Sequence, residues 1–404
     1  MIRLPRARLT LAAALLLGGG ALAGCDGGAA GSTSSWVAQP DFQGNDEPAP
    51  QLPNPGLPGL PTPSLPSTGP QSSQPNRIPQ PSQPNGSPQP SPSQAADPNV
   101  VATNLVEPTG LVVLPDGSAL VGERKTGRIY RVQPGGHGPG TLVQTLAGVN
   151  PTGDGGLLDL AISPTYAEDG LIYAYLTTGT DNRVVHFPLG STPTVVIGGI
   201  PRGSTGNTGR ITFDATGALL TGTGNAGNPA LAAAPTSLAG KVLRTDDIGQ
   251  PAPDNPLPNS PIYARGLSGL TGLCVDAQSG LRVAVSADRA TVVRADGDYT
   301  DATGGRALPT TLAGGGGCAL AGGQLVVATA AGKALAVATV GKDGTIGTFT
   351  GSLGGIYGRL RTVVAGSDGA LWLTTRNRDG QGKPVADDDR VIRITNPDST
   401  SPVT

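Results

Sequence analysis

A short unit recurs six times along the second part of this chain. Each copy is a turn containing glycine, followed by a strand in which apolar residues alternate with others. From Gly117 to Gly369 the repeats are about 50 residues apart, which leaves room for a four-stranded antiparallel sheet in each. The units are PDGSALVGE (115–123), EDGLIYAYL (168–176), ATGALLTGT (215–223), QSGLRVAVS (278–286), AGGQLVVAT (321–329) and SDGALWLTT (367–375).

These repeats predict an all-β fold, a six-bladed β-propeller of four-stranded antiparallel blades. The 63 Gly and 39 Pro among 404 residues are too many for a helical protein. A propeller ring has to be closed, and we expect segment 99–105 (NVVATNL) to add a strand to the blade that contains 389–395 (DRVIRIT). A β-helix or a sandwich is disfavoured because the repeats are long and irregular.

The N-terminus has the pattern of a bacterial lipoprotein. Three arginines within residues 3–8 precede an apolar stretch from Leu9 to Ala23, which suits a secretion signal better than a membrane span. The LAGC sequence at 22–25 predicts a signal peptide over 1–24 and lipidation of Cys25. The lipid would anchor the protein to the extracytoplasmic face of a cell membrane. The alternative interpretation is a short membrane anchor with an incidental cysteine.

A proline-rich segment separates this end of the chain from the repeats. Between Pro40 and Pro98, 18 of 59 residues are proline and only five are charged, so the segment cannot build a core. We predict that 25–98 is a disordered, extended linker between the membrane and a propeller over 99–404. A proline-rich ligand for a partner domain is the less favoured interpretation.

Charge and cysteine content narrow the choice of partners. With 27 basic and 29 acidic residues and no basic run, the chain is not expected to bind nucleic acid. Besides Cys25 the only cysteines are Cys274 and Cys318. They either form a disulfide or remain separate thiols, and their separation of 44 residues in the sequence does not decide between the two. Neither His137 nor His186 has a neighbouring Cys or His, so no metal site is predicted.

The region from 100 to 396 resembles the soluble PQQ-dependent glucose/sorbosone dehydrogenases. The resemblance is carried by 108–132, 155–178 and 357–377, and above all by SLAGKVLRTD (237–246) followed by PAPDNPLPNSPIY (251–263). The family fold is a six-bladed propeller. Membership implies oxidation of a sugar hydroxyl by hydride transfer to PQQ, with a histidine as general base and Ca²⁺ as a second cofactor.

Three site motifs of that family are altered in this chain. The family motif His-x-x-Gly-Arg reads GNTGR at 206–210, so Gly206 stands at the position of the base, and we interpret His137 and His186 as ordinary surface or blade residues. The motif Gly-His-Arg-Asn-Pro-Gln-Gly-Leu reads GLSGLTGL at 266–273, with Ser268 and Gly269 in place of the Arg and Asn that contact PQQ. The calcium-binding run is replaced by SADR at 286–289.

Other elements of the family site are retained. Arg359 and Arg361 match the arginine pair that the family directs at the PQQ carboxylates, and alternation along a strand would put both on one face. Asp154 occupies a polar or acidic pocket position. The alternatives are, for the arginines, an ion pair with the acidic run 387–389 or a solvated strand face, and for Asp154, the stabilisation of a turn.

The loss of the base, of the Arg-Asn pair and of the calcium run favours one function. According to this prediction, the protein is a membrane-anchored surface lipoprotein whose propeller is a non-catalytic or altered binding module for a sugar or an envelope protein. The first alternative is an active PQQ-dependent dehydrogenase of a sugar or alcohol hydroxyl, with PQQ and Ca²⁺ as cofactors. The second is a structural spacer without a ligand.

Overall fold

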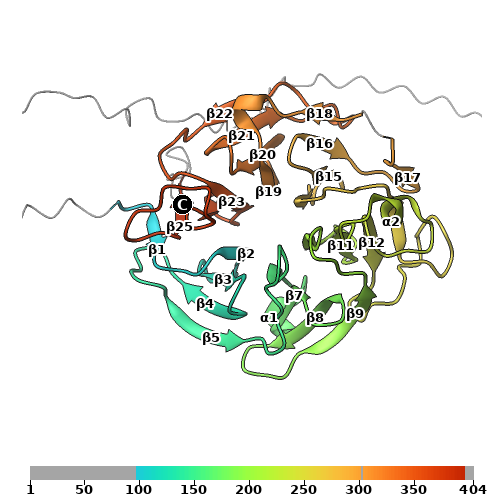
Figure 1. The fold of residues 1–404 in the computed structure, drawn as a ribbon, viewed down its shortest axis with the longest axis horizontal. Coiled ribbons are helices and arrows are strands. Elements are labelled where there is room, and N and C mark those ends of the chain that lie inside the picture. The colour runs from blue at the N-terminus through green and yellow to red at the C-terminus, as the bar shows by residue number, and fades with distance from the viewer. Residues whose placement is uncertain (1–96, 302–303, 396–404) are drawn as a thin grey trace, which may run out of the picture. The chain divides into compact units, whose positions relative to one another are not determined.

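The computed structural model describes residues 97–301 and 304–395, and it confirms the six-bladed β-propeller (Figure 1). The predicted signal peptide, Cys25 and nearly all of the predicted linker lie outside the described residues. Within the described ranges, no helix is long and apolar enough to cross a membrane.

Blades are numbered here in chain order by their innermost strands. Blade 1 contains β2 (Pro108–Val113), β3 (Ala119–Glu123), β4 (Arg128–Val132) and β5 (Thr141–Thr145). Blade 2 contains β6 (Leu157–Ile162), β7 (Leu171–Thr177), β8 (Asn182–Pro188) and β9 (Thr194–Ile200). Blade 3 contains β10 (Gly209–Phe213), β11 (Leu219–Thr223), β12 (Lys241–Thr245) and β13 (Ile262–Arg265).

The second half of the ring follows the same plan. Blade 4 contains β14 (Gly272–Val275), β15 (Arg282–Val285), β16 (Arg289–Val292) and β18 (Arg306–Ala307). Blade 5 contains β19 (Gly315–Ala321), β20 (Gln324–Thr329), β21 (Ala334–Thr339) and β22 (Thr350–Ser352). Blade 6 contains β23 (Leu360–Ala365), β24 (Leu371–Thr375), β25 (Val391–Ile394) and β1 (Val100–Ala102). One short strand, β17 (Gly297–Asp298), pairs in parallel with β13 and gives blade 3 a fifth strand.

Ring closure occurs as the sequence indicates. The outermost strand of blade 6, β1, pairs with β25 in antiparallel register, with Val100 opposite Ile392. The first and last described strands therefore belong to one sheet, and this pairing closes the ring.

The repeated glycine turns join the first and second strands of every blade. In the first repeat Gly117 has a φ of 78°, and in the last Gly369 has a φ of 76°, in the left-handed region that glycine adopts without steric cost. The preceding aspartate fixes the turn, since Asp116 Oδ1 accepts a hydrogen bond from Ser118 N at 3.0 Å. Asp368 makes the same contact with Ala370 N.

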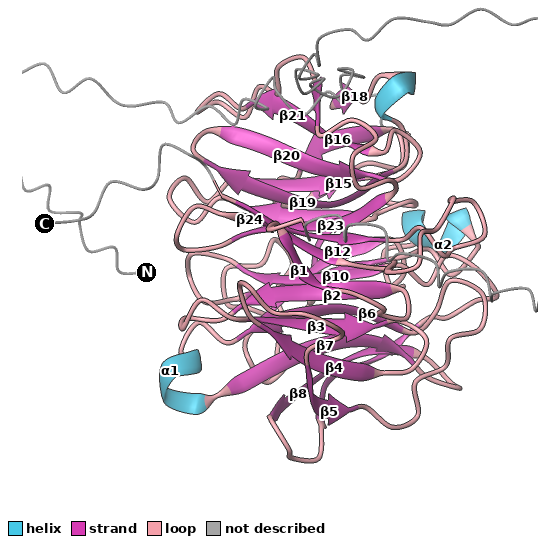
Figure 2. Cartoon of the chain, turned by 90° about the vertical axis from the view of Figure 1, so that its left-hand side faces the viewer, coloured by secondary structure: helices cyan, strands magenta, loops and turns pink. Residues whose placement is uncertain are grey.

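The apolar core is divided among the contacts between neighbouring blades. Between blades 1 and 2, for example, Leu120 and Ile129 pack with Ile172 and Phe187. Only Trp372 among the fully buried side chains is larger than tyrosine, and it fills the contact between blades 6 and 1. Described helices are confined to loops: α1 (Tyr166–Asp169) and α2 (Pro229–Ala233) lie at opposite faces of the ring (Figure 2), and a single 3₁₀ turn spans Thr310–Leu312.

Cys274 and Cys318 are joined by a disulfide. Cys274 lies in β14 and Cys318 in β19, so the bond connects the innermost strands of blades 4 and 5, with Cα atoms 5.7 Å apart. Both residues are buried in the apolar contact between these blades. The disulfide therefore ties two neighbouring blades together close to the central channel.

A buried carboxyl group lies in the closing blade. Asp389 is fully buried, and its Oδ1 accepts a hydrogen bond from Asn377 N at 2.5 Å, whereas Oδ2 has no partner within the described residues. Burial, reinforced by the charge of Asp388, raises the pKa of Asp389 to about 6. The folded protein therefore holds this proton more tightly than the unfolded chain does.

We expect Asp389→Asn to remove a pH-dependent loss of stability. In the natural protein this group makes the free energy of unfolding fall by about 2–3 kcal/mol as the pH rises from about 4 to 6. Urea unfolding at pH 4 and pH 7 measures the effect, and the variant should gain stability relative to the natural protein between these two values. Asp387→Asn, at an exposed neighbour, is the control. An equal stability difference at both pH values would contradict the prediction.

Candidate functional site

A cavity of about 460 Å³ opens at the end of the channel where the inner strands begin. Its wall includes the first residues of several inner strands and the loops that follow β3 and β24. Its charged lining residues are Glu107, Arg124, Lys125, Asp154, Arg210, Arg361, Arg376 and Asp379. Arginine thus dominates this cavity, although the whole chain is nearly neutral.

The acidic residues other than Asp154 are held in ion pairs. Arg124 Nε lies 2.6 Å from Glu107 Oε2, and Lys125 also contacts Glu107. Burial alone would raise the pKa of Glu107, but the hydrogen bonds and charges of Arg124 and Lys125 outweigh it and lower the pKa. Arg376 Nε lies 2.9 Å from Asp379 Oδ2. Burial alone would raise the pKa of Asp379, but the hydrogen bond from Gln381 N and the contacts with Arg359 and Arg376 outweigh it and lower the pKa. These carboxylates are weak proton acceptors at neutral pH.

Arg361 is a cation without a protein partner in the described part of the chain. It makes no hydrogen bond or ion pair there, and its Nε is buried. Burial, together with the like charges of Arg376, Arg210 and Arg124, lowers the pKa of its guanidinium. An anion bound in the cavity would offset both the burial of the Arg361 charge and its repulsion by the neighbouring arginines.

Arg359 has a different environment. Its Nη2 lies 2.9 Å from Asp379 Oδ2 and 3.2 Å from Gln381 Oε1, and it does not line the cavity. Its partner is not the acidic run 387–389, where Asp388 pairs with Arg390. Strict alternation fails because the register of β23 with β24 shifts between Leu360 and Thr362. The structure therefore separates the two arginines that the motif pairs.

Asp154 lines the cavity and holds the loop that contains Gly206. Its Oδ2 accepts a hydrogen bond from Gly206 N at 2.7 Å, and its Oδ1 accepts two from Asn207, at 3.1 Å from N and 2.9 Å from Nδ2. Both carboxylate oxygens are thus engaged with the protein. Asp154 therefore stabilises the loop that contains Gly206 and also forms part of the cavity wall.

The position of the missing base has no room for a side chain. Gly206 has a φ of 71°, and a Cβ atom there would lie 2.4 Å from Asn225 Oδ1 and 2.5 Å from Gly227 N. The two histidines lie elsewhere: His137 is exposed between β4 and β5, and His186 in β8 packs edge-on against Tyr173. Neither lines the cavity.

The substituted residues of the other two altered motifs lie together and outside the arginine-rich cavity, although Thr271 of the first of these motifs lines that cavity. Ser268 and Gly269 line a separate hollow of about 230 Å³, together with Ser286 and Asp288. Over 97–301 and 304–395 there is no group of three or more His, Cys, Asp or Glu side chains that could hold a metal ion.

Sequence reasoning missed Arg124, Arg376, Glu107 and Asp379. Arg124 and Glu107 flank the strands of blade 1, whereas Arg376 and Asp379 follow β24, about 250 residues later. No local pattern marks these residues, because only ring closure brings blade 6 beside blade 1. Arg124, Arg376 and Asp379 share one feature, a place in the loop after the second strand of a blade, whereas Glu107 precedes a first strand.

Comparison with known proteins gives consistent results. A model of the Glucose / Sorbosone dehydrogenase family matches residues 105–284. The PQQ-bound form of an aldose sugar dehydrogenase from Streptomyces coelicolor is 36% identical, with coverage of 73% of this chain and 95% of that chain and a TM-score of 0.68. An oxidoreductase from Thermus thermophilus, described as a glucose dehydrogenase, is 31% identical, with coverage of 73% and 98% and a TM-score of 0.65.

A further relative is matched only in part. An uncharacterized protein of Synechocystis sp. strain PCC 6803 is 28% identical over 227 residues, which is 45% of this chain and 53% of that protein. The chain thus spans about half the length of this relative. The six-bladed ring, the cavity at its axis and the solved structures above together show that the chain belongs to the glucose/sorbosone dehydrogenase family.

Proposed function

We propose that this protein is a membrane-anchored surface lipoprotein whose propeller binds an anionic ligand, PQQ or a similar polycarboxylate, without oxidising a sugar. The observation that carries the proposal is the combination of Arg361, unpaired within the described residues, with a cavity in which Asp154, Glu107 and Asp379 are all engaged. The cavity offers positive charge to a ligand but no free base among the residues described.

The residues present fit the carboxylates of PQQ. This cofactor carries three carboxylates, and Arg361 with the neighbouring Arg376 and Arg124 provides guanidinium groups that pair with carboxylates. Bound PQQ would supply a two-electron acceptor. Within the described residues no group of three or more His, Cys, Asp or Glu side chains could hold the calcium ion of the family site.

The residues that line this cavity do not provide the base that the oxidation of a hydroxyl group requires. That reaction needs a base within hydrogen-bond reach of the substrate proton. Gly206 replaces the family histidine, and Asp154 already accepts three N–H groups. Glu107 and Asp379 have lowered pKa values in their ion pairs. A bound sugar would therefore keep its proton.

The location rests on the sequence. The LAGC pattern at 22–25 and the proline-rich segment to Pro98 support a lipid anchor on Cys25 with a spacer that holds the propeller away from the membrane. A binding module in that place would present the arginine-rich cavity to solutes of the cell envelope.

The second candidate is an active PQQ-dependent sugar dehydrogenase. It is favoured by the 36% identical relative, which was solved with PQQ bound. This candidate requires a proton acceptor other than the residue at position 206.

Titration of the purified protein with PQQ, with and without Ca²⁺, tests the proposal. We expect saturable binding that does not depend on Ca²⁺, and no oxidation of aldoses with a dye as electron acceptor. Aldose oxidation would establish the second candidate. The absence of PQQ binding would contradict the proposed ligand class.

A further inference from the structure

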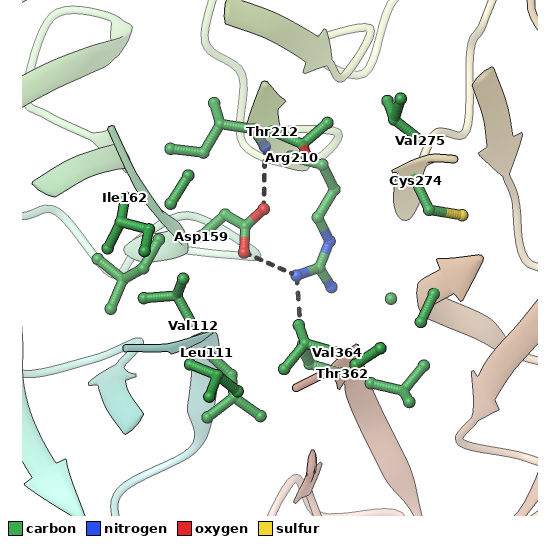
Figure 3. A pocket seen from close by; sticks show the side chains of 18 of the residues that line it. Leu111, Val112, Asp159, Ile162, Arg210, Thr212, Cys274, Val275, Thr362 and Val364 are labelled. Atoms are coloured by element: carbon green, nitrogen blue, oxygen red, sulfur yellow. Dashed lines mark hydrogen bonds and ion pairs between the residues drawn. The ribbon is translucent and has the colours of Figure 1, made fainter. Parts of the chain in front are cut away.

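A second cavity, of about 640 Å³, opens at the opposite end of the channel (Figure 3). All six inner strands contribute to its wall. Near the glycine turn each blade contributes partly buried side chains to this wall, and we call one such residue from each blade, six in all, the collar. The collar consists of Val112, Ile162, Thr212, Val275, Leu320 and Val364.

The collar is aliphatic except for Thr212. Partly buried aliphatic side chains arranged around a cavity favour an apolar occupant, since each Å² of apolar surface removed from water contributes about 25 cal/mol. The volume lies within the range of roughly 300–1,000 Å³ that is typical of small-molecule sites. A sugar would find few hydrogen-bonding side chains here.

The cavity ends at one cationic side chain. Arg210 extends across the channel towards Asp159 and Thr362 (Figure 3). Its Nε donates to the Thr271 carbonyl at 2.6 Å, and its Nη1 lies 3.4 Å from both Asp159 Oδ1 and Thr362 Oγ1. Its Nη2 has no partner within the described ranges. One guanidinium nitrogen is therefore available to a ligand.

Asp159 is the only other charged residue in the lining described. Its Oδ2 accepts a hydrogen bond from Ile211 N at 2.9 Å, so this oxygen is committed to the backbone. Burial raises the pKa of Asp159 more than Arg210 lowers it, which weakens its repulsion of an anion. Arg210 is thus only loosely paired with the carboxyl group beside it.

We infer that the second cavity binds a single-chain fatty carboxylate, with its chain against the collar and its carboxylate on Arg210 Nη2. The aliphatic wall selects the chain, and the guanidinium at its end selects an anionic head group over a neutral or cationic one. Arg210 lines both cavities, but no other lining residue is shared between them, so this inference does not rest on the proposed function.

Calorimetric titration with three ten-carbon amphiphiles tests the head group. Decanoate should bind tightest, decanol more weakly, and decyltrimethylammonium about tenfold more weakly than decanoate or worse. Equal affinity for the three compounds would overturn the assignment of Arg210. Failure of decanoate to bind at all would overturn the site.

Substitutions in the collar test the location. Val364→Asp and Leu320→Asp, in two different blades, should each weaken decanoate binding about tenfold or more, because a carboxylate would face the chain. Val195→Asp is the matched control, since Val195 is 49% exposed on β9 and lies outside the cavity. Arg361→Met, in the other cavity, should leave decanoate binding unchanged.

Circular dichroism melts of each variant identify any that fail to fold, and two collar positions keep the test valid if one does. Wild-type affinity in a folded collar variant would overturn the inference. Loss of PQQ binding together with retained decanoate binding would contradict the proposed function and leave this site standing.

Discussion

Replacement of Arg361 by methionine is expected to raise the melting temperature of the ligand-free protein and to weaken PQQ binding strongly. The natural side chain has no partner in the described structure and lies among Arg376, Arg210 and Arg124, so its charge is unfavourable until an anion binds. Methionine keeps an unbranched, flexible side chain, although a shorter one, and removes this charge, which should stabilise the fold by about 1–3 kcal/mol. Loss of a charge-assisted pair should weaken PQQ binding about 100-fold. Thermal unfolding and calorimetric titration measure the two effects.

Arg359→Met is the matched control, and it should have the opposite effect on stability. Arg359 is paired at 2.9 Å with Asp379, whose side chain is 5% exposed, so its loss leaves a buried carboxylate with one arginine fewer. This change should destabilise the protein by about 3 kcal/mol, with a smaller effect on PQQ binding because Arg359 does not line the cavity. If both variants lower the melting temperature equally, Arg361 is a structural residue like Arg359.

Removal of the disulfide is expected to have the largest effect on stability. The bond between Cys274 and Cys318 closes a loop across a separation of 44 residues, which in the chain-entropy description contributes about 4 kcal/mol. For a propeller of this size the loss should lower the melting temperature by roughly 6 °C. Calorimetry of the Cys274→Ala, Cys318→Ala variant, and of the natural protein with a reductant, measures it.

The reductant supplies the internal control for this experiment. It should shift the melting temperature of the natural protein and leave that of the double alanine variant unchanged. A natural protein that melts at the same temperature with and without reductant would show that the bond does not stabilise the propeller.

The propeller could be predicted because its signals are local and repeated. The turn at Gly117 requires a positive φ, and the strand after it alternates between two faces, so each blade is specified within about 50 residues. Closure could be predicted as well, since 99–105 and 389–395 are the strands left over at the two ends of the repeats. The short fifth strand β17 in blade 3 could not, because two residues carry no pattern.

Residues of the site could be predicted from the sequence only where they belong to a motif of the family. The sequence identified Arg361, Asp154 and the absence of a base at Gly206, and all of these lie at or beside the same cavity. It could not separate Arg359 from Arg361, because their difference arises from an irregular register in β23 and from Asp379 in a later loop.

The number of blades, their order, the strand that closes the ring and the loss of the family histidine can all be read from the amino-acid sequence. These follow from local backbone preferences and from residue identity, which neighbouring residues in the chain specify. The pairing of the charges, in contrast, is set by the folded ring. Ion pairing depends on distances of a few ångströms between side chains from blades that lie far apart in the chain, and closure of the ring sets those distances.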